Sequence, residues 1–228
     1  MEYKDLKNYG KSFPEIFRAI PPKINTKIMK IGMGVIQKYL GIDKMKDFLN
    51  QIIKERESFM EKDLTAIREY CKDEEFIKSM IENSAIFSAL TKFVEDKVAL
   101  DIHLEIIDNI MPMLGNLIFP SSEDFLPFEE PLEAFKKYII MMMDADQKVG
   151  VHYYEIIEDT PNAFQINILK CAYYEIPKQL GVPMTTLTNC YADDVFLPEV
   201  GKKAGIKFIR TGTLARGNKC CDFRFEKV

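Results

Sequence analysis

Residues 206–226 read IKFIRTGTLARGNKCCDFRFE, two runs of strand-forming residues on either side of a short turn. The turn, Arg216-Gly217-Asn218, contains glycine and asparagine, which tolerate the left-handed backbone that tight turns need. β-Branched and aromatic residues dominate the flanking runs, as is typical of paired strands. The pattern therefore predicts a hairpin in which Ile206 to Leu214 pairs with Lys219 to Glu226.

The second of these strands divides its side chains between two faces, because successive residues of a strand point in opposite directions. The two sets are Cys221, Phe223 and Phe225 on one face, and Cys220, Asp222 and Arg224 on the other. The apolar set predicts that the face carrying Cys221 is buried against helices. A thiol on that face would also look into any pocket between the sheet and the helices.

A second hairpin is predicted upstream, where Val151 to Glu158 and Phe164 to Leu169 flank the turn-forming residues 159–162. Two short helices are expected between the hairpins. The first runs from Cys171 to Leu180 and ends at a glycine, and the second runs from Thr185 to Val195.

The first 150 residues have a helical pattern. Apolar residues with a period of about 3.6 predict helices over residues 25–40, 45–67, 73–94 and 100–117, the last interrupted at Pro112. A proline-rich stretch, residues 119–131, is expected to be a loop before a further helix that begins at Pro131.

Together these elements predict the α+β class: a helical N-terminal portion packed on a small antiparallel β-sheet with short inserted helices. The helical stripes need an apolar partner surface, and the sheet supplies one. We therefore expect a single domain over residues 1–228, with a helical scaffold at 1–120 and a sheet-bearing, motif-rich portion at 131–228.

Bulk composition limits the classes of partner. The formal net charge of −4 gives no basic face for nucleic acid, and no apolar run approaches the roughly 20 residues that span a bilayer. The start of the chain lacks the pattern of a secretory signal, so we expect a cytoplasmic protein. Five cysteines, an odd number, then argue for reduced thiols and against a disulfide framework.

Thiols, carboxylates and guanidinium groups concentrate between Cys171 and Arg224. Cys190 lies three residues before Asp193, a spacing that places both on one helix face. This pair has three possible roles: a nucleophile with its acid, two metal ligands, or a buried thiol beside a solvated carboxylate. Cys171, where a strand meets a helix, is a reactive thiol or a buried hinge residue.

Arg210 and Arg224 are predicted on paired strands of the last hairpin. A guanidinium group suits two-point binding of a substrate carboxylate. A cross-strand ion pair with Asp222 or a neighbouring glutamate is the commoner arrangement.

The two histidines add little at this level. His103 lies in an isoleucine-rich helix and is expected to be structural, and His152 near a strand start could reach the sheet face. No zinc-protease, zinc-finger or Ser-His-Asp signature is present, so no metal ligand is assigned. A zinc site built from Cys171, Cys190, Cys221 and an aspartate is the weaker alternative, because the spacings contain no tight ligand pair.

The order of motifs in the tail resembles a known family. Cys171 opens CAYYEIPKQLG, Cys190-x-x-Asp193 follows, and RTGTLARGNKCCDFRF ends the pattern with Thr213, Gly217 and Cys221-Asp222-Phe223-Arg224. Over about the last eighty residues the chain is similar to the L-2-amino-thiazoline-4-carboxylic acid hydrolase family.

This resemblance implies a hydrolase of C–N or C=N bonds other than peptide bonds, acting on a small molecule that bears a carboxylate and using no cofactor. Opening the aminothiazoline ring needs a nucleophile, a proton donor and an anchor for the substrate carboxylate. The residues assigned to these roles are Cys221 or Cys190 as nucleophile, Asp193 or Asp222 as acid/base, and Arg210 or Arg224 as anchor, with Cys171 and Thr213 also placed in the substrate site.

A non-enzymatic module that binds a small molecule or a metal is the alternative, since a helical cap over a sheet also makes a pocket. A purely structural interaction domain with buried, inert thiols is a third reading. The enzyme hypothesis requires that folding bring the tail thiols, carboxylates and guanidinium groups together.

Overall fold

The computed structural model describes residues 2–228 and has the α+β architecture that the sequence predicts. Its helices are α1 (Phe13–Arg18), α2 (Pro22–Leu40), α3 (Met45–Met60), α4 (Thr65–Arg68), α5 (Glu74–Leu90), α6 (Asp96–Ile118), α7 (Pro131–Val149), α8 (Ala172–Leu180) and α9 (Thr185–Gly201). Its strands are β1 (His152–Asp159), β2 (Ala163–Cys171), β3 (Ile206–Ile209) and β4 (Cys221–Lys227). None of the helices in the described chain combines the length and apolar character needed to span a bilayer.

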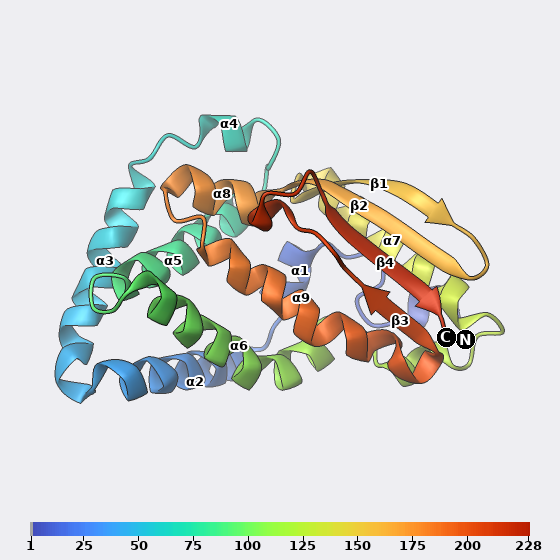
Figure 1. The fold of residues 1–228 in the computed structure, drawn as a ribbon, viewed down its shortest axis with the longest axis horizontal. Helices are drawn as coiled ribbons and strands as arrows, with labels where there is room; N and C mark the ends of the chain where they lie inside the picture. The colour runs from blue at the N-terminus through green and yellow to red at the C-terminus, as the bar shows by residue number, and fades with distance from the viewer. Residues whose placement is uncertain (1) are drawn as a thin grey trace.

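The four strands form one antiparallel sheet in the order β1-β2-β4-β3 (Figure 1). Both predicted hairpins are present, and they join where β2 pairs with β4. In that register Ile168 is opposite Cys221 and Phe164 is opposite Phe225. The last hairpin has a shorter first strand than predicted, because the chain leaves the sheet after Ile209 and forms a long connection.

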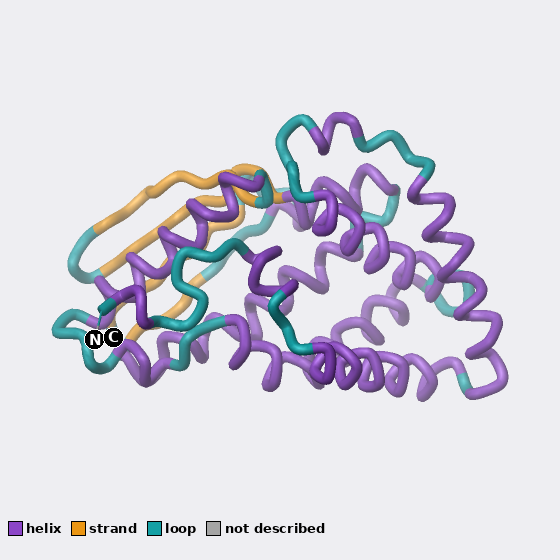
Figure 2. The backbone as a smooth tube through the Cα atoms, turned by 180° about the vertical axis from the view of Figure 1, so that it is seen from behind, coloured by secondary structure: helices purple, strands orange, loops and turns teal. Residues whose placement is uncertain are grey.

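Helix α7 lies along one face of this sheet (Figure 2). Phe225 from β4 packs on Phe135 from α7 with ring centroids 4.8 Å apart, and Phe164 and Ile166 from β2 are buried on the same side. We call this the inner face of the sheet. Helix α9 packs against β3 and against α6, so it runs between the sheet and the helical portion (Figure 1).

Strands β1 and β2 each contain an irregularity in their pairing. In β2 the partner of Tyr154 is Ile168 and the partner of Tyr153 is Lys170, so Leu169 is an extra residue. In β1, Ile157 is extra in the same way. One bulge in each strand keeps the overall register, so His152 and Cys171 end up as direct partners. Bulges of this kind re-aim side chains and are frequent beside active sites.

The helical portion differs from the prediction at two points. The amphipathic pattern of residues 45–67 is split, because α3 ends at Met60 and a separate turn of helix, α4, begins at Thr65. Pro112 does not interrupt α6, which continues to Ile118. Proline removes one backbone hydrogen bond, but Met111, Leu114 and Gly115 around it are buried in packing, which offsets that loss.

The segment 119–131 was expected to be a loop, and it contains a short 3-10 helix at Ser122–Phe125. The Phe125 side chain is 0% exposed and packs against Phe135 and Tyr138 of α7. The main apolar core includes Ile16 and Ile110 as well as these residues. The segment is therefore part of the core that the helical and sheet-bearing portions share.

Candidate functional site

Cys171 is the last residue of β2 and the N-cap of α8. The next amide, that of Ala172, donates a 2.8 Å hydrogen bond to the carbonyl of Val151, which fixes the junction against the start of β1. The free amides of a first helical turn and the helix dipole favour negative charge at this position. The Cys171 side chain therefore stands at the N-terminal end of α8, and its strand partner is His152.

His152 is held by a buried carboxylate. Its Nδ1 lies 2.7 Å from Oδ2 of Asp146. Asp146 lies in the last turn of α7, and its side chain is 0% exposed. The other oxygen of Asp146 accepts a 2.7 Å hydrogen bond from the backbone N–H of Phe13, the first residue of α1. Both carboxylate oxygens are thus satisfied, and the imidazole is oriented with Nδ1 toward Asp146.

Cys171 interacts with the same imidazole. Because Asp146 occupies Nδ1, Nε2 is the nitrogen available to the thiol. Burial alone would lower the pKa of His152, but the charge of Cys171, a hydrogen bond from Asp146 and a hydrogen bond with Cys171 together raise this pKa to about 10. The imidazole is then protonated at neutral pH. Cys171, His152 and Asp146 form a line of nucleophile, base and orienting carboxylate.

Aromatic rings fix the imidazole from both sides. Tyr173, two residues after the cysteine, stacks on His152 with ring centroids 5.6 Å apart and an interplanar angle of 23°. Phe13 meets the imidazole edge-on at 6.1 Å. The same segment that supplies the N–H to Asp146 therefore also packs on His152.

Two further tail thiols face this site. Cys190 on α9 and Cys221 on β4 both respond to the charge of Cys171. Burial raises the pKa of each to about 12, with Asp193 adding to the effect at Cys190. Cys221 is 6% exposed, and its sulfur accepts a hydrogen bond from the Leu214 amide at 3.2 Å. Both thiols are therefore protonated at neutral pH.

Arg210 connects α9 to the end of β3. Its Nη1 lies 2.9 Å from Asp193, and its Nη2 lies 2.6 Å from both Asp194 and the carbonyl of Cys190. The guanidinium group also stacks near the ring of Phe223, 5.3 Å from its centroid. Only 3% of the Arg210 side chain is exposed, so these internal partners occupy it.

The Asp193 side chain is partly exposed to solvent, although many protein atoms surround its carboxylate. Its side chain is 37% exposed, yet neighbouring protein atoms displace enough water to raise its pKa to about 6. The charges of Arg210 and His152 oppose this rise. The Asp193 carboxylate is thus close enough to His152 for the charge of the imidazole to act on it.

The remaining predicted residues lie elsewhere. The carboxylate of Asp222 accepts hydrogen bonds from the amides of Thr211 and Gly212 and from the Thr211 hydroxyl, and these bonds lower its pKa in spite of partial burial. Arg224 pairs with Glu158 at 2.5 Å and Glu226 at 2.6 Å on the outer face of the sheet.

Thr213 is fully buried, and its backbone N–H and carbonyl hold the turn through Asn218. Folding thus brings Arg210 to Asp193 and to the backbone of Cys190, and it leaves Asp222 and Arg224 in local ion-pair and turn contacts.

Residues 123–225 match the family model of L-2-amino-thiazoline-4-carboxylic acid hydrolase. This match supports the resemblance seen in the tail over these residues. No curated protein matches the chain. The matched region begins in the loop before α7 and includes every strand, so it contains Asp146, His152, Cys171, Asp193 and Arg210. Helices α1 to α6 lie outside the hydrolase-family match, although α1 supplies the Phe13 contacts to the site.

The sequence analysis assigned no catalytic role to His152 or to Asp146. A signal for His152 was present, because counting outward from the turn at residues 159–162 pairs it with Cys171. Nothing in the sequence separated Asp146 from the nearby Asp144, whose carboxylate instead accepts a hydrogen bond from the Tyr154 hydroxyl. Only the orientation of the last turn of α7 distinguishes the two.

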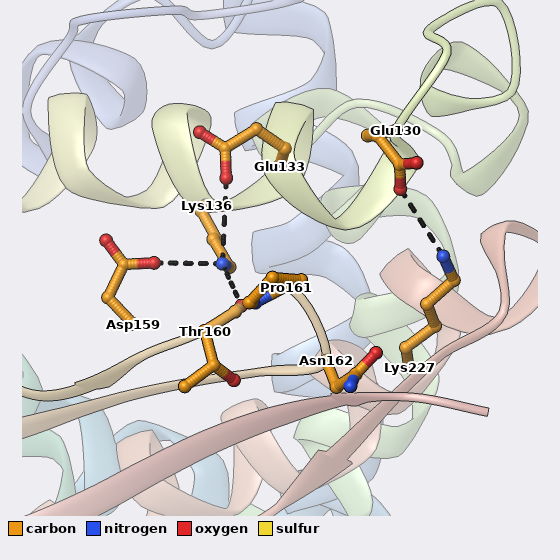
Figure 3. Close-up of a pocket in the computed structure, with 8 residues that line it drawn as sticks. All are labelled: Glu130, Glu133, Lys136, Asp159, Thr160, Pro161, Asn162 and Lys227. Carbon is orange, nitrogen blue, oxygen red and sulfur yellow. Dashed lines mark hydrogen bonds and ion pairs between the residues drawn. The ribbon is translucent and has the colours of Figure 1, made fainter.

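No group of three or more histidine, cysteine, aspartate or glutamate side chains within residues 2–228 has the arrangement of a metal site. A surface hollow of about 440 Å³ lies at the turn between β1 and β2 (Figure 3). There Lys136 is fixed by Asp159 at 2.9 Å and by the carbonyl of Thr160, and Lys227 pairs with Glu130. This hollow is at the opposite end of β1 from His152, and its ion pairs tie the hairpin to α7.

Proposed function

We propose that the protein is a cysteine-dependent hydrolase that opens an amidine-type C–N or C–S bond in a 2-aminothiazoline-like ring, with Cys171 as nucleophile. The observation that carries this proposal is the line formed by Cys171, His152 and the fully buried Asp146. The family match, whose name refers to the same ring, supports the choice of substrate class.

The mechanism follows from these three side chains. The Cys171 thiolate adds to the ring carbon that lies between sulfur and nitrogen. His152, protonated and held by Asp146, donates its proton to the atom that leaves as the ring opens. The neutral imidazole then removes a proton from a water molecule, which attacks the thiol-bound carbon and releases Cys171. One water is consumed, and the thiolate–imidazolium pair is restored.

Cys190 and Cys221 keep their predicted place as alternative nucleophiles. Their raised pKa values weigh against them, because the thiolate is the reactive form. The acid/base role predicted for Asp222 has less support than that of His152, since hydrogen bonds from the 211–212 backbone keep it ionised.

The test uses purified protein and L-2-amino-thiazoline-4-carboxylate. We expect turnover, a covalent adduct on Cys171 detected by intact and peptide mass spectrometry, and a loss of at least about 1,000-fold in kcat for Cys171→Ser. Cys220→Ser, in the outer set of the last hairpin, is the matched control and should retain the wild-type rate. Undiminished turnover in Cys171→Ser would falsify the mechanism. An absence of both turnover and adduct would leave the binding-module alternative.

A further inference from the structure

Helix α3 presents an apolar surface to solvent as well as one to the core. Its buried side, which includes Phe48 and Phe59, packs on α5. A second side carries apolar side chains that are at least 47% exposed: Ile42, in the 3-10 turn that leads into α3, and Leu49, Ile53 and Met60. In Figure 1, α3 lies at the end of the molecule opposite the sheet. The exposed surface is therefore separate from the candidate site.

Two charged residues share this side of α3. Lys46 and Glu57 are exposed, and together with the apolar residues they recur at intervals of three or four residues, which places them on one helix face. We call the whole set the α3 stripe: Ile42, Lys46, Leu49, Ile53, Glu57 and Met60. Within residues 2–228 the side-chain hydrogen bonds of α3 involve Gln51 and Glu55. Lys46 and Glu57 are therefore available to a partner.

The α3 stripe is complementary to its own reverse. Three pairs of its residues are centred at or beside Gln51: Leu49 with Ile53, Lys46 with Glu57, and Ile42 with Met60. A second copy laid antiparallel about that centre therefore matches apolar residues with apolar ones and the lysine with the glutamate. A twofold axis through the centre makes each pairing occur twice. In a parallel arrangement each lysine would face a lysine and each glutamate a glutamate, and like charges repel.

We propose that this protein forms a twofold-symmetric homodimer through antiparallel contact between the α3 stripes of two copies. The stripe extends about 27 Å at roughly 1.5 Å per residue, so this pair of helices makes a contact smaller than a standard interface. Reversible dimerisation is therefore expected, with a dissociation constant on the order of 10 µM. Helices α1 to α6 lie outside the hydrolase-family match, so the interface belongs to the part of the chain that the family comparison does not describe.

Sedimentation equilibrium measures the association directly. Between about 1 and about 300 µM protein, the average mass should rise from the 26.4 kDa of one chain toward twice that value. Ile53→Glu places a charge against the apolar residues of the second copy, so it should raise the dissociation constant at least about tenfold. Met29→Glu alters an exposed apolar residue of α2 outside the stripe. It is the matched control and should leave the dissociation constant unchanged.

An exchange of charges tests the antiparallel register. Lys46→Glu and Glu57→Lys each replace an attractive pair by a repulsive one at both ends of the contact, so each should raise the dissociation constant about fivefold or more. The double variant restores opposite charges and should return the constant to near the wild-type value. Both positions are exposed, so thermal melting should show that all these variants remain folded.

A carbodiimide, which joins an amine directly to a carboxylate, tests the same contact in the unaltered protein. Lys46 and Glu57 lie 11 residues apart on one helix, about 16 Å along its axis, so a direct bond between them can form only between two chains. Peptide mass spectrometry of the crosslinked dimer should identify this bond.

A monomer at every concentration would overturn the proposal and leave the α3 stripe to a different partner. A dimer that persists unchanged in Ile53→Glu would overturn it too, because the two copies would then meet at another surface. The antiparallel register fails if the double charge variant associates no better than the single ones.

Discussion

The two faces of the last strand contain similar residue types in very different surroundings. On the inner face lies Cys221, and burial raises the pKa values of the Asp193 carboxylate and of the thiols of Cys190 and Cys221. On the outer face Asp222 and Arg224 form short, local contacts that keep both groups ionised. The same six residues, CCDFRF, therefore contribute to chemistry on one side of the sheet and to surface pairing on the other.

The difference teaches how to choose among candidate residues. Groups whose ionisation is perturbed by burial together with a specific charge partner are candidates for function. Groups in exposed ion pairs contribute little even to stability, typically up to about 1 kcal/mol. By this criterion His152 and Asp193 are stronger candidates than Asp222 and Arg224, and Asp146 joins them because its carboxylate holds the His152 imidazole.

The largest effect on activity is expected from replacing Asp146 of α7, which holds the His152 imidazole. Asp146→Asn keeps the size of the side chain but removes the charge that orients and stabilises the His152 imidazolium, so kcat should fall by between about 100-fold and 10,000-fold. Steady-state kinetics provide the measurement. Asp144→Asn, on the same turn of α7 and bonded to Tyr154, is the control and should change kcat little. Equal losses in the two variants would contradict an orienting role.

A backbone contact behind His152 should give the next largest effect. Gly150 has a φ of +77°, and a Cβ there would lie 1.8 Å from the carbonyl oxygen of Tyr70. Gly150→Ala should lower the free energy of unfolding by more than about 3 kcal/mol, since it combines this clash with the left-handed backbone. Gly181→Ala has a similar φ of +85° but open space around it, so it should cost only about 1–2 kcal/mol. Urea denaturation of both variants separates the clash from the backbone strain.

The pH dependence of kcat/KM sharpens the comparison further. If Asp193 acts as a carboxylate, activity should rise about tenfold per pH unit up to its pKa of about 6, and then stay level. Activity should fall again above the His152 pKa of about 10, where the proton donor is lost. Arg210, Asp194 and His152 are the charged groups that face Asp193.

An Asp193 that works as the proton donor, the role assigned from the sequence, gives the opposite sign: activity falls above about pH 6. Profiles of wild type and Asp193→Asn decide between the two. Loss of the acidic limb in Asp193→Asn is the expected result.

The smallest effect is expected on the outer face. Arg224→Ala removes the ion pairs with Glu158 and Glu226, which are partly exposed, so the midpoint of urea unfolding should change little. KM for the ring substrate should be unchanged. A rise in KM of tenfold or more would instead restore Arg224 as the carboxylate anchor predicted from the sequence.

The sequence predicted most elements because their signals are local. Apolar periodicity identified α2 and α5, and the predicted start at residue 73 coincides with the N-cap Asp73, whose side chain accepts from the Phe76 amide. Turn residues located both hairpins. The errors at α3 and α6 arose because tertiary packing overrides local sequence patterns. The apolar period continues past Met60, where α3 ends. Pro112 lies inside the packed helix α6 without interrupting it.

The candidate site could be predicted only in part from the sequence. Cys171, Cys190, Asp193, Arg210 and Cys221 were named from residue type and spacing, and of these Arg210 contacts Asp193 and the carbonyl of Cys190. Their partners could not be assigned, because the pairing of Arg210 with Asp193 and Asp194 joins a strand end to a helix 17 residues earlier. Strand alternation correctly separated Cys221 from Cys220, since that rule needs no tertiary information.

By itself, then, the sequence determined the α+β class, the hairpins, the two faces of β4 and the family of the tail, because periodicity, turn residues and motifs are properties of neighbouring residues. Only the tertiary structure decided which histidine and which aspartate meet Cys171. That choice depends on two bulges that offset each other in β1 and β2, on the last turn of α7, and on the N-terminus of α1 reaching Asp146 across 133 residues. Contacts of this kind arise from packing between distant segments, and no local pattern in the chain encodes them.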